Sequence, residues 1–271
     1  MRKNIKFERT MKLVVLAALL LPSGAFAGNL TAEQIMEKAS ESRKLDGSKA
    51  KISLTLYDAS GKAGEPRVIK MVTKMYDGGK TEKKFFRFTA PADIKGTGIL
   101  TYDYEKKDDD MWLFLPALRK TRRIMGSKKS GSFMGSEFSY ADMNTPVLSN
   151  YNLKILKEEK EGGVDCWVIE VLPKNKDVAD EEGYSKKIFW IGKPDYMVRK
   201  TDFYDLDGKL LKVLTTKGVK LVDKAKKRYR LMEMVVVNKQ NKRKSVFKTE
   251  SIENAPDVKD EYFTTAFLER P

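Results

Sequence analysis

The sequence predicts a mainly β fold in which an antiparallel sheet is closed or half closed into a barrel. Roughly a dozen short segments alternate apolar with polar residues, as strands do, and turn residues separate them at regular spacing. Only one convincing helix accompanies them. Several strands are apolar on both faces, so they need cover on both sides. The sheet must therefore curl over its own interior or line a space left for a ligand.

The one convincing helix lies near residue 31. Thr31 can cap it, and Gln34 lies three residues later, at the position that completes a capping box. Ile35, Met36 and Ala39 then give the helix an apolar stripe. This pattern predicts a short amphipathic helix before the first strand.

The strands follow in chain order, each ending at a turn. We expect them at 52–56, 68–76, 83–89, 99–104, 111–115, 117–124, 153–156, 167–172, 187–191, 198–204, 210–214, 231–238 and 246–252. A segment of about 25 residues, reaching to Asn150, interrupts them and is too long for an ordinary connection. We expect it to be functional or partly helical around 136–143. Residues 61–65 and 174–183 are predicted to be polar surface loops, and 261–268 a short helix or strand.

The first residues of the chain indicate export. Basic residues precede an apolar run at 13–21, and Ala-Phe-Ala at 25–27 matches the small-residue pattern of a signal peptidase site. We expect residues 1–27 to be a cleaved signal peptide and residues 28–271 to form a single domain. No cysteine follows the cut, so we expect a freely diffusing periplasmic protein without a lipid anchor. An uncleaved N-terminal anchor and a start at Met11 are the alternatives.

The chain is strongly basic. It has 53 lysine and arginine residues against 38 aspartate and glutamate residues, a formal net charge of +15. Such a balance usually indicates an anionic partner. Because export argues against nucleic acid, we expect an anionic lipid, lipopolysaccharide or an acidic protein.

The sequence lacks the residues of most catalytic and metal sites. It contains no histidine, which removes the usual general base and the commonest zinc ligand. Its one cysteine, Cys166, cannot form an intramolecular disulfide and is expected to be buried. Asp108, Asp109 and Asp110 could bind a cation or serve hydrolysis, but consecutive strand residues alternate between faces. We therefore expect no enzyme activity, no cofactor and no metal.

The stretch 111–143 carries the candidate site. An apolar strand leads into a basic strand and then into a glycine- and serine-rich loop with three large apolar side chains. Apolar side chains beside a cluster of cations suit a ligand with an apolar body and an acidic head group, such as a lipid. The residues expected to contact lipid are Trp112, Phe114, Leu115, Phe133, Met134 and Phe138. Those expected to bind an anionic headgroup or a partner are Arg119, Arg122 and Arg123, because guanidinium groups bind phosphate in bidentate fashion.

A plain structural reading of the same residues is equally open at this point. Trp112 and Phe114 could be ordinary core residues, and the arginines a solvated strand face. If the loop is a cover, Gly131 and Gly135 would let it open. Each buried methylene is worth about 0.8 kcal/mol, so a 16-carbon chain costs on the order of 12 kcal/mol to expose. A carrier must therefore offer nearly that much apolar contact.

Four stretches between Phe88 and Met143 carry a family resemblance. They read FTAPADIKGTG at 88–98, MWLFLP at 111–116, RKTRRI at 119–124 and GSEFSYADM at 135–143. They resemble the bacterial outer membrane lipoprotein-sorting protein family, the LolA-like proteins related to the treponemal periplasmic lipoprotein of that fold. The similarity runs through most of residues 28–271.

The resemblance implies a mainly β (α+β), LolA/LolB-like fold, an incomplete antiparallel β-barrel of about 10–12 strands wrapped over a few helices. It also implies a periplasmic carrier that binds a lipid, or the acyl chains of a lipidated protein, in an apolar cavity. Its expected partners are an inner membrane transporter of the resistance-nodulation-division type and an outer membrane acceptor. The alternative is a scaffold or accessory protein of an envelope transporter complex that binds no lipid. The fold transfers between relatives better than the cargo does.

Overall fold

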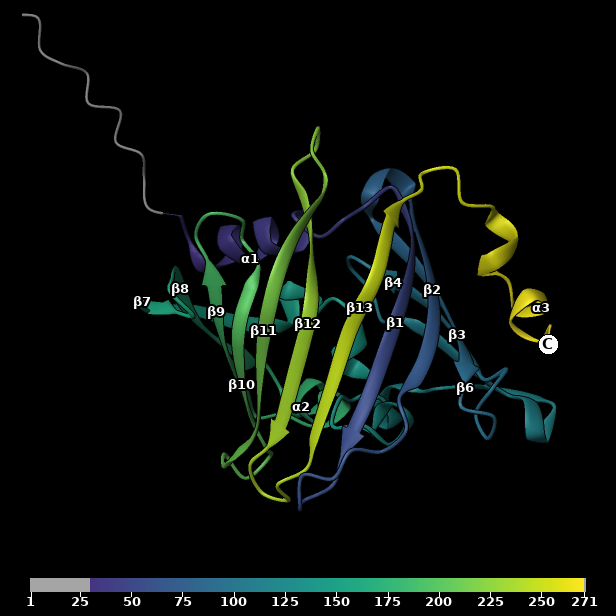
Figure 1. The fold of residues 1–271 in the computed structure, drawn as a ribbon. Helices are drawn as coiled ribbons and strands as arrows, with labels where there is room; N and C mark the ends of the chain where they lie inside the picture. Colours follow the sequence, from purple (N-terminus) through teal and green to yellow (C-terminus); the bar gives the residue numbers. More distant parts are fainter. Residues whose placement is uncertain (1–29, 271) are drawn as a thin grey trace, which may run out of the picture.

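The computed structural model describes residues 30–270, and within that range the chain forms one sheet of thirteen antiparallel strands with three α-helices (Figure 1). This architecture confirms the predicted incomplete antiparallel barrel, with thirteen strands in place of about 10–12. The expected signal peptide, residues 1–27, lies outside the described residues. No helix within 30–270 is long and apolar enough to cross a bilayer.

The elements follow the predicted order closely. The strands are β1 Gly47–Tyr57, β2 Arg67–Tyr76, β3 Thr81–Ala90, β4 Gly98–Tyr104, β5 Asp110–Leu115, β6 Lys120–Arg123, β7 Tyr151–Glu161, β8 Val164–Pro173, β9 Lys186–Gly192, β10 Val198–Tyr204, β11 Leu210–Asp223, β12 Arg228–Asn238 and β13 Lys244–Asn254. The helices are α1 Ala32–Glu41, α2 Lys176–Glu182 and α3 Thr265–Leu268. Short 3₁₀ turns lie at Asp77–Gly79, Pro116–Leu118, Gly126–Lys128, Phe133–Gly135, Ala141–Met143, Leu148–Asn150 and Asp260–Phe263.

The capping box of α1 forms as predicted. Thr31 accepts a hydrogen bond from the Gln34 backbone N–H, and the Gln34 side chain accepts one from the Thr31 N–H. The buried residues of α1 include Ile35 and Met36, which pack against β7, β8 and β9. Cys166 is fully buried, as expected.

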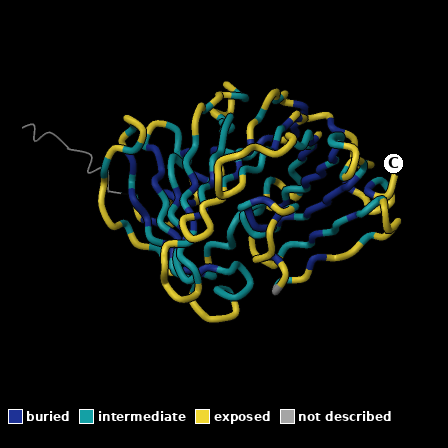
Figure 2. Tube along the Cα trace, turned by 60° about the horizontal axis from the view of Figure 1, so that its bottom comes forward, coloured by how far each residue is buried: buried dark blue, intermediate teal, exposed yellow. Residues whose placement is uncertain are grey.

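Strand order decides where the long connection runs. The sheet reads β6-β5-β4-β3-β2-β1-β13-β12-β11-β10-β9-β8-β7, so the first and last strands pair in its middle and β6 and β7 form its edges. Residues 124–150, which we call the crossing segment, join β6 to β7 and must pass from one edge to the other. Phe133 and Phe138 of this segment pack against residues of the central strands, so the segment lies inside the curve of the sheet. Figure 2 shows that much of the buried chain lies in the interior of the molecule.

The two faces of the sheet have separate cores. On β1, Ala50, Ile52 and Leu54 face the crossing segment, while Lys49 and Lys51 face the other way. We call the side of the crossing segment the concave face and the other side the convex face. Helix α1 covers the β7–β9 end of the concave face, and residues 255–270, the C-terminal arm, cover β2–β5 on the convex face.

Three sequence expectations need correction. Residues 174–183 are not simply a loop, because Asn175 caps a helical turn by accepting a hydrogen bond from Val178 and Gly183 ends it in the left-handed region. Strand β11 extends well past Leu214 through polar residues that hide it in the sequence. Strand β6 is shorter than 117–124, since the chain turns before Arg119. The tail is confirmed as helical, and 136–143 contains one 3₁₀ turn.

Candidate functional site

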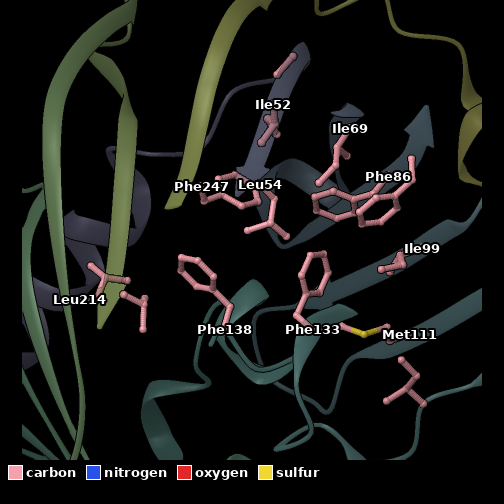
Figure 3. Packing of buried hydrophobic residues seen from close by; sticks show 14 of the residues in the cluster. Ile52, Leu54, Ile69, Phe86, Ile99, Met111, Phe133, Phe138, Leu214 and Phe247 are labelled. Carbon is pink, nitrogen blue, oxygen red and sulfur yellow. The ribbon is translucent and has the colours of Figure 1, made fainter. Parts of the chain in front are cut away.

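Two phenylalanines of the crossing segment fill the concave face. Phe133 and Phe138 are 0% and 2% exposed. Phe133 lies 6.2 Å from Phe86 and 6.4 Å from Phe88 between ring centroids, and Phe138 lies 5.9 Å from Phe247. Figure 3 shows both rings rising from the segment toward the strands. The interior of the curved sheet is thus filled by the chain itself.

A tight loop presents these two rings side by side. The Phe133 N–H donates to the Phe138 carbonyl at 2.8 Å, and the Ser136 hydroxyl donates to the Phe133 carbonyl at 2.7 Å. Met134 adopts a left-handed conformation with φ of 51°, followed by Gly135 with φ of 76°. A residue other than glycine pays roughly 1–2 kcal/mol for that conformation. Local hydrogen bonds and burial of the rings offset this cost.

A first lysine clamp holds the segment on the β3–β4 side. Lys84 on β3 donates to the Met143 carbonyl and pairs with Asp103 on β4, each at 2.8 Å. Asp103 also accepts a hydrogen bond from the Thr145 N–H. Burial opposes the ammonium charge, but the Asp103 and Glu82 carboxylates outweigh it and raise the pKa of Lys84. The charged form of this buried lysine is therefore favoured.

A second lysine clamp holds the segment on the β11 side. Lys212 donates to the Glu137 carbonyl at 2.8 Å and pairs with Asp142 at 2.7 Å. The Tyr184 hydroxyl also donates to Asp142. Burial alone would raise the pKa of Asp142, but the Lys212 ammonium outweighs burial and lowers it. Ser245 on β13 adds a hydrogen bond from the Glu137 N–H.

The β4–β5 turn carries a carboxylate with an unusual pKa. Asp109 accepts a hydrogen bond from the Asn144 side chain at 2.6 Å. Burial, followed by the neighbouring Asp103 carboxylate, raises the pKa of Asp109 to about 7, against the lowering effects of Lys84 and Lys129. Asp109 therefore changes charge near neutral pH at a contact that holds the crossing segment.

The six expected lipid contacts do not form one surface. Phe133, Met134 and Phe138 meet on the concave face. Trp112 and Phe114 point to the convex face, where they pack under the C-terminal arm. Leu115 ends β5 half-buried. Their role as lipid contacts remains a prediction, but the two groups would have to contact different ligands or different parts of one.

The three predicted headgroup arginines lie at one exposed edge of the sheet. Arg122 and Arg123 are exposed on edge strand β6, and Arg119 immediately precedes it. Arg123 pairs with Asp110. Two large apolar side chains flank the strand, Leu118 at 50% exposed and Met125 at 58%. The edge thus combines cations with exposed apolar groups, whereas its binding role remains a prediction.

Solved structures place the chain among known proteins. It is 30% identical to an outer membrane lipoprotein-sorting protein domain from Vibrio parahaemolyticus. The match covers 89% of this chain and 98% of that one, with a TM-score of 0.79. The chain belongs to the LolA-like family of outer membrane lipoprotein-sorting proteins. The sequence model of a family described only as "Uncharacterized protein" matches residues 80–270.

Two further structures support the fold of this LolA-like chain. A DUF1329 family protein from Desulfovibrio piger is 27% identical, with 88% of this chain and 99% of that one covered and a TM-score of 0.78. A LolA superfamily protein from Nitrosomonas europaea is 20% identical over 88% and 99% of the two chains, with a TM-score of 0.66, and shows the fold alone. No curated protein sequence matches the chain.

Sequence reasoning missed the residues that hold the crossing segment. Lys84 shares its strand face with Phe86 and Phe88, and Lys212 shares its face with Leu214, so both lysines break an apolar stripe that points inward. A lysine at an inward position needs a buried partner. That break in periodicity was the available signal. It could not name the partners, because Asp103 is 19 residues from Lys84 and Asp142 is 70 residues from Lys212.

Proposed function

We propose that this LolA-like protein is a periplasmic carrier that binds a lipid, or the acyl chains of a lipidated protein, against its concave face. In this proposal the crossing segment is a lid. The observation that carries it is the placement of Phe133 and Phe138, whose rings occupy the apolar surface on which an acyl chain would lie. An entering acyl chain would replace the apolar contacts of the two rings. The free-energy cost of this exchange is therefore far lower than that of moving the rings out and leaving an empty apolar cavity.

The energetics favour exchange over simple opening. Phenylalanine burial is worth about 1.5–3 kcal/mol per side chain, and each acyl methylene about 0.8 kcal/mol. An acyl segment of roughly four to eight methylenes therefore offsets the loss of both rings from the core. The glycines at 131 and 135 flank Phe133 and Met134, and Gly135 already has a positive φ. They are the positions at which we expect the loop to turn outward.

Edge strand β6 is the proposed docking surface for a membrane or a membrane partner. Arg119, Arg122 and Arg123 project there beside the exposed Leu118 and Met125. A basic residue near an anionic bilayer surface contributes about 1 kcal/mol, and exposed leucine and methionine can enter the interface. An inner membrane transporter of the resistance-nodulation-division type and an outer membrane acceptor are the partners we propose for loading and release. We propose no catalytic step.

The proposal is tested by the lipid content of the native protein. The full chain is expressed with its own signal region, purified without detergent, extracted with organic solvent and analysed by mass spectrometry. A carrier yields stoichiometric lipid, and a Phe138→Ala variant, with a loosened lid, retains a different amount. Stable protein that carries no lipid contradicts the carrier.

That second outcome would favour a non-lipid-binding scaffold or accessory protein of an envelope transporter complex. The same occupied interior fits this alternative, in which Phe133 and Phe138 are permanent core residues and no lipid enters. The same purification separates the two, because a scaffold should retain partner protein rather than lipid.

A further inference from the structure

The convex face carries a groove that the lid does not touch. It has a volume of about 530 Å³ and lies between strands β13, β1, β2 and β3 and the C-terminal arm. Pockets for small ligands span about 300–1,000 Å³. This groove therefore has room for a small amphiphile.

Sheet register places three of the cations that line the groove in one row. Lys51 on β1 is directly opposite Lys70 on β2, and Lys70 is directly opposite Arg87 on β3. All three side chains line the groove. Like charges directly opposite each other on neighbouring strands repel. A row of three cations across adjacent strands is therefore a place where a bound anion relieves repulsion.

Two of the three cations in this row have side chains that can reach a ligand. Among residues 30–270, neither Lys51 nor Lys70 has a carboxylate within 4.0 Å of its ammonium group, and both are exposed. Arg87 instead donates to the carbonyls of Gly96, Phe267 and Leu268, which fixes the arm against the sheet. Two of the three cations thus have no carboxylate in direct contact, and the third holds the arm that forms a wall of the groove.

On β2 and β3 the neighbouring row of the same face is apolar, while on β1 and β13 it carries Lys49 and Glu253, which are directly opposite each other. Val72 is directly opposite Phe85, two residues along each strand from the cations, and they are 8% and 4% exposed. Phe85 lies 5.3 Å from Phe267 and 6.3 Å from Tyr262 between ring centroids. Phe85 and the two aromatic rings of the arm form an apolar wall at the β3 side of the groove. Glu253 is the one acidic residue that lines the groove.

We propose that this groove binds one anionic single-chain lipid, with its acidic head on Lys51 and Lys70 and its acyl chain along Val72, Phe85 and Phe267. Charge complementarity selects the head, and the adjacent apolar row takes the chain. The site is separate from the concave face, and it stands whether or not the lid opens.

The test measures binding of three probes to the full chain by calorimetry, below the micelle concentration of each lipid. The probes are lysophosphatidylglycerol, lysophosphatidylcholine and inorganic phosphate. We expect the anionic lipid to bind at least about tenfold more tightly than the zwitterionic one, since each cation near an anionic head contributes to affinity. Phosphate alone should bind weakly, because it lacks the chain. Equal affinity for phosphate and the anionic lipid would overturn the proposal.

The decisive variant is Lys51→Gln/Lys70→Gln, whose exposed positions leave the core intact. It should lose on the order of tenfold in affinity for the anionic lipid and become indifferent to head charge. The matched control is Lys154→Gln/Lys220→Gln, two exposed lysines elsewhere on the sheet, which should change nothing. Equal effects in the two variants would reject the site.

A third variant separates this inference from the carrier proposal. Phe138→Ala loosens the lid but does not touch the groove. If it alone changes lysophosphatidylglycerol affinity, the lipid binds on the concave face, the groove proposal fails and the carrier proposal stands. If only the lysine variant changes affinity, the groove is supported independently.

Discussion

The concave and convex faces are each covered by a segment outside the sheet. On each face a lysine of the sheet contacts one backbone carbonyl and one carboxylate of that segment. On the concave face, Lys212 contacts a carbonyl and a carboxylate of the crossing segment. On the convex face, Lys74 contacts the Val258 carbonyl and the Asp260 carboxylate of the C-terminal arm, each at 2.8 Å. The pairs differ in exposure: the side chains are 4% and 8% exposed for Lys212 and Asp142, but 23% and 71% for Lys74 and Asp260.

The two covers therefore differ in their ion pairs and not in whether they have buried side chains, since Phe263 and Leu268 of the arm are 2% and 0% exposed. Burial makes the concave ion pairs costly to break, because a lone charge is left in a dry site. Solvent screens the convex pair, so its loss costs little. The buried ion pairs therefore resist movement of the concave cover, and an acyl chain can replace only the apolar contacts of Phe133 and Phe138, whereas the convex arm leaves a groove beside it.

The largest expected difference between the two covers comes from their aromatic anchors. Phe133→Ala should lower the free energy of unfolding by about 3–5 kcal/mol, because it leaves a cavity in the concave core. Phe267→Ala on the half-buried convex arm should cost less than half as much. Urea denaturation of both variants measures this. Equal losses would remove the distinction between the two covers.

The lysine clamps give the next largest difference. Lys212→Met should destabilise the fold by about 3 kcal/mol by leaving Asp142 charged and buried. Lys74→Met should cost no more than about 1 kcal/mol, because its partner is exposed. The double variant Lys212→Met/Asp142→Asn should recover part of the loss, since the unpaired charge is gone. A double variant no more stable than the single one would show that the pair is not the cause.

Asp109 on the concave side should make the stability of the fold depend on pH. The raised pKa of Asp109, about 7, means that the folded protein binds a proton that the unfolded chain releases near pH 4. Because of this group, the free energy of unfolding should fall by about 2 kcal/mol as the pH rises from 5 to 7. The groups facing it are Asp103, Lys84 and Lys129, with Asn144 as its hydrogen-bond partner.

Thermal unfolding of the native chain and of Asp109→Asn across that pH range measures this contribution. The variant should have a flatter profile between pH 5 and pH 7, because the titrating carboxyl is gone. Parallel profiles for the two proteins would assign the proton to another group.

The smallest expected effect on stability comes from the β6 edge. Replacing Arg119, Arg122 and Arg123 with glutamine should change unfolding free energy by less than about 0.5 kcal/mol, because all three are exposed. Retention on anionic liposomes should nevertheless fall. The matched control replaces Lys154, Lys160 and Lys220, which are exposed elsewhere on the sheet. Unchanged retention of the arginine variant would remove the membrane-docking role.

The strands could be predicted because most keep a regular apolar pattern on the face they bury. Strand pairing between β1 and β13 could not, since nothing local links residues 200 positions apart. Helix α2 carried its caps in the sequence, Asn175 and Gly183, but its polar surface resembled a loop. Strand β11 was truncated at Leu214 because its second half is largely polar and solvated.

The site was predicted in part for similar reasons. Phe133 and Phe138 stood out as apolar residues among glycines and serines, but only the strand order reveals that their segment crosses the concave face. Alternation put Trp112 and Leu115 on opposite faces of β5, without telling which cover lies on each. Cover by a distant segment is a tertiary property, so the convex groove had no signal in the sequence.

Hydrogen exchange of the crossing segment shows whether this segment is a lid. Amide exchange is measured by mass spectrometry across residues 128–138, in the full chain with and without phospholipid, with α1 and β13 as internal references. If the segment is a lid displaced by an acyl chain, lipid changes exchange in 128–138 while the references stay constant. Identical exchange in 128–138 with bound lipid confirmed in the same sample would contradict a lid that moves to admit it.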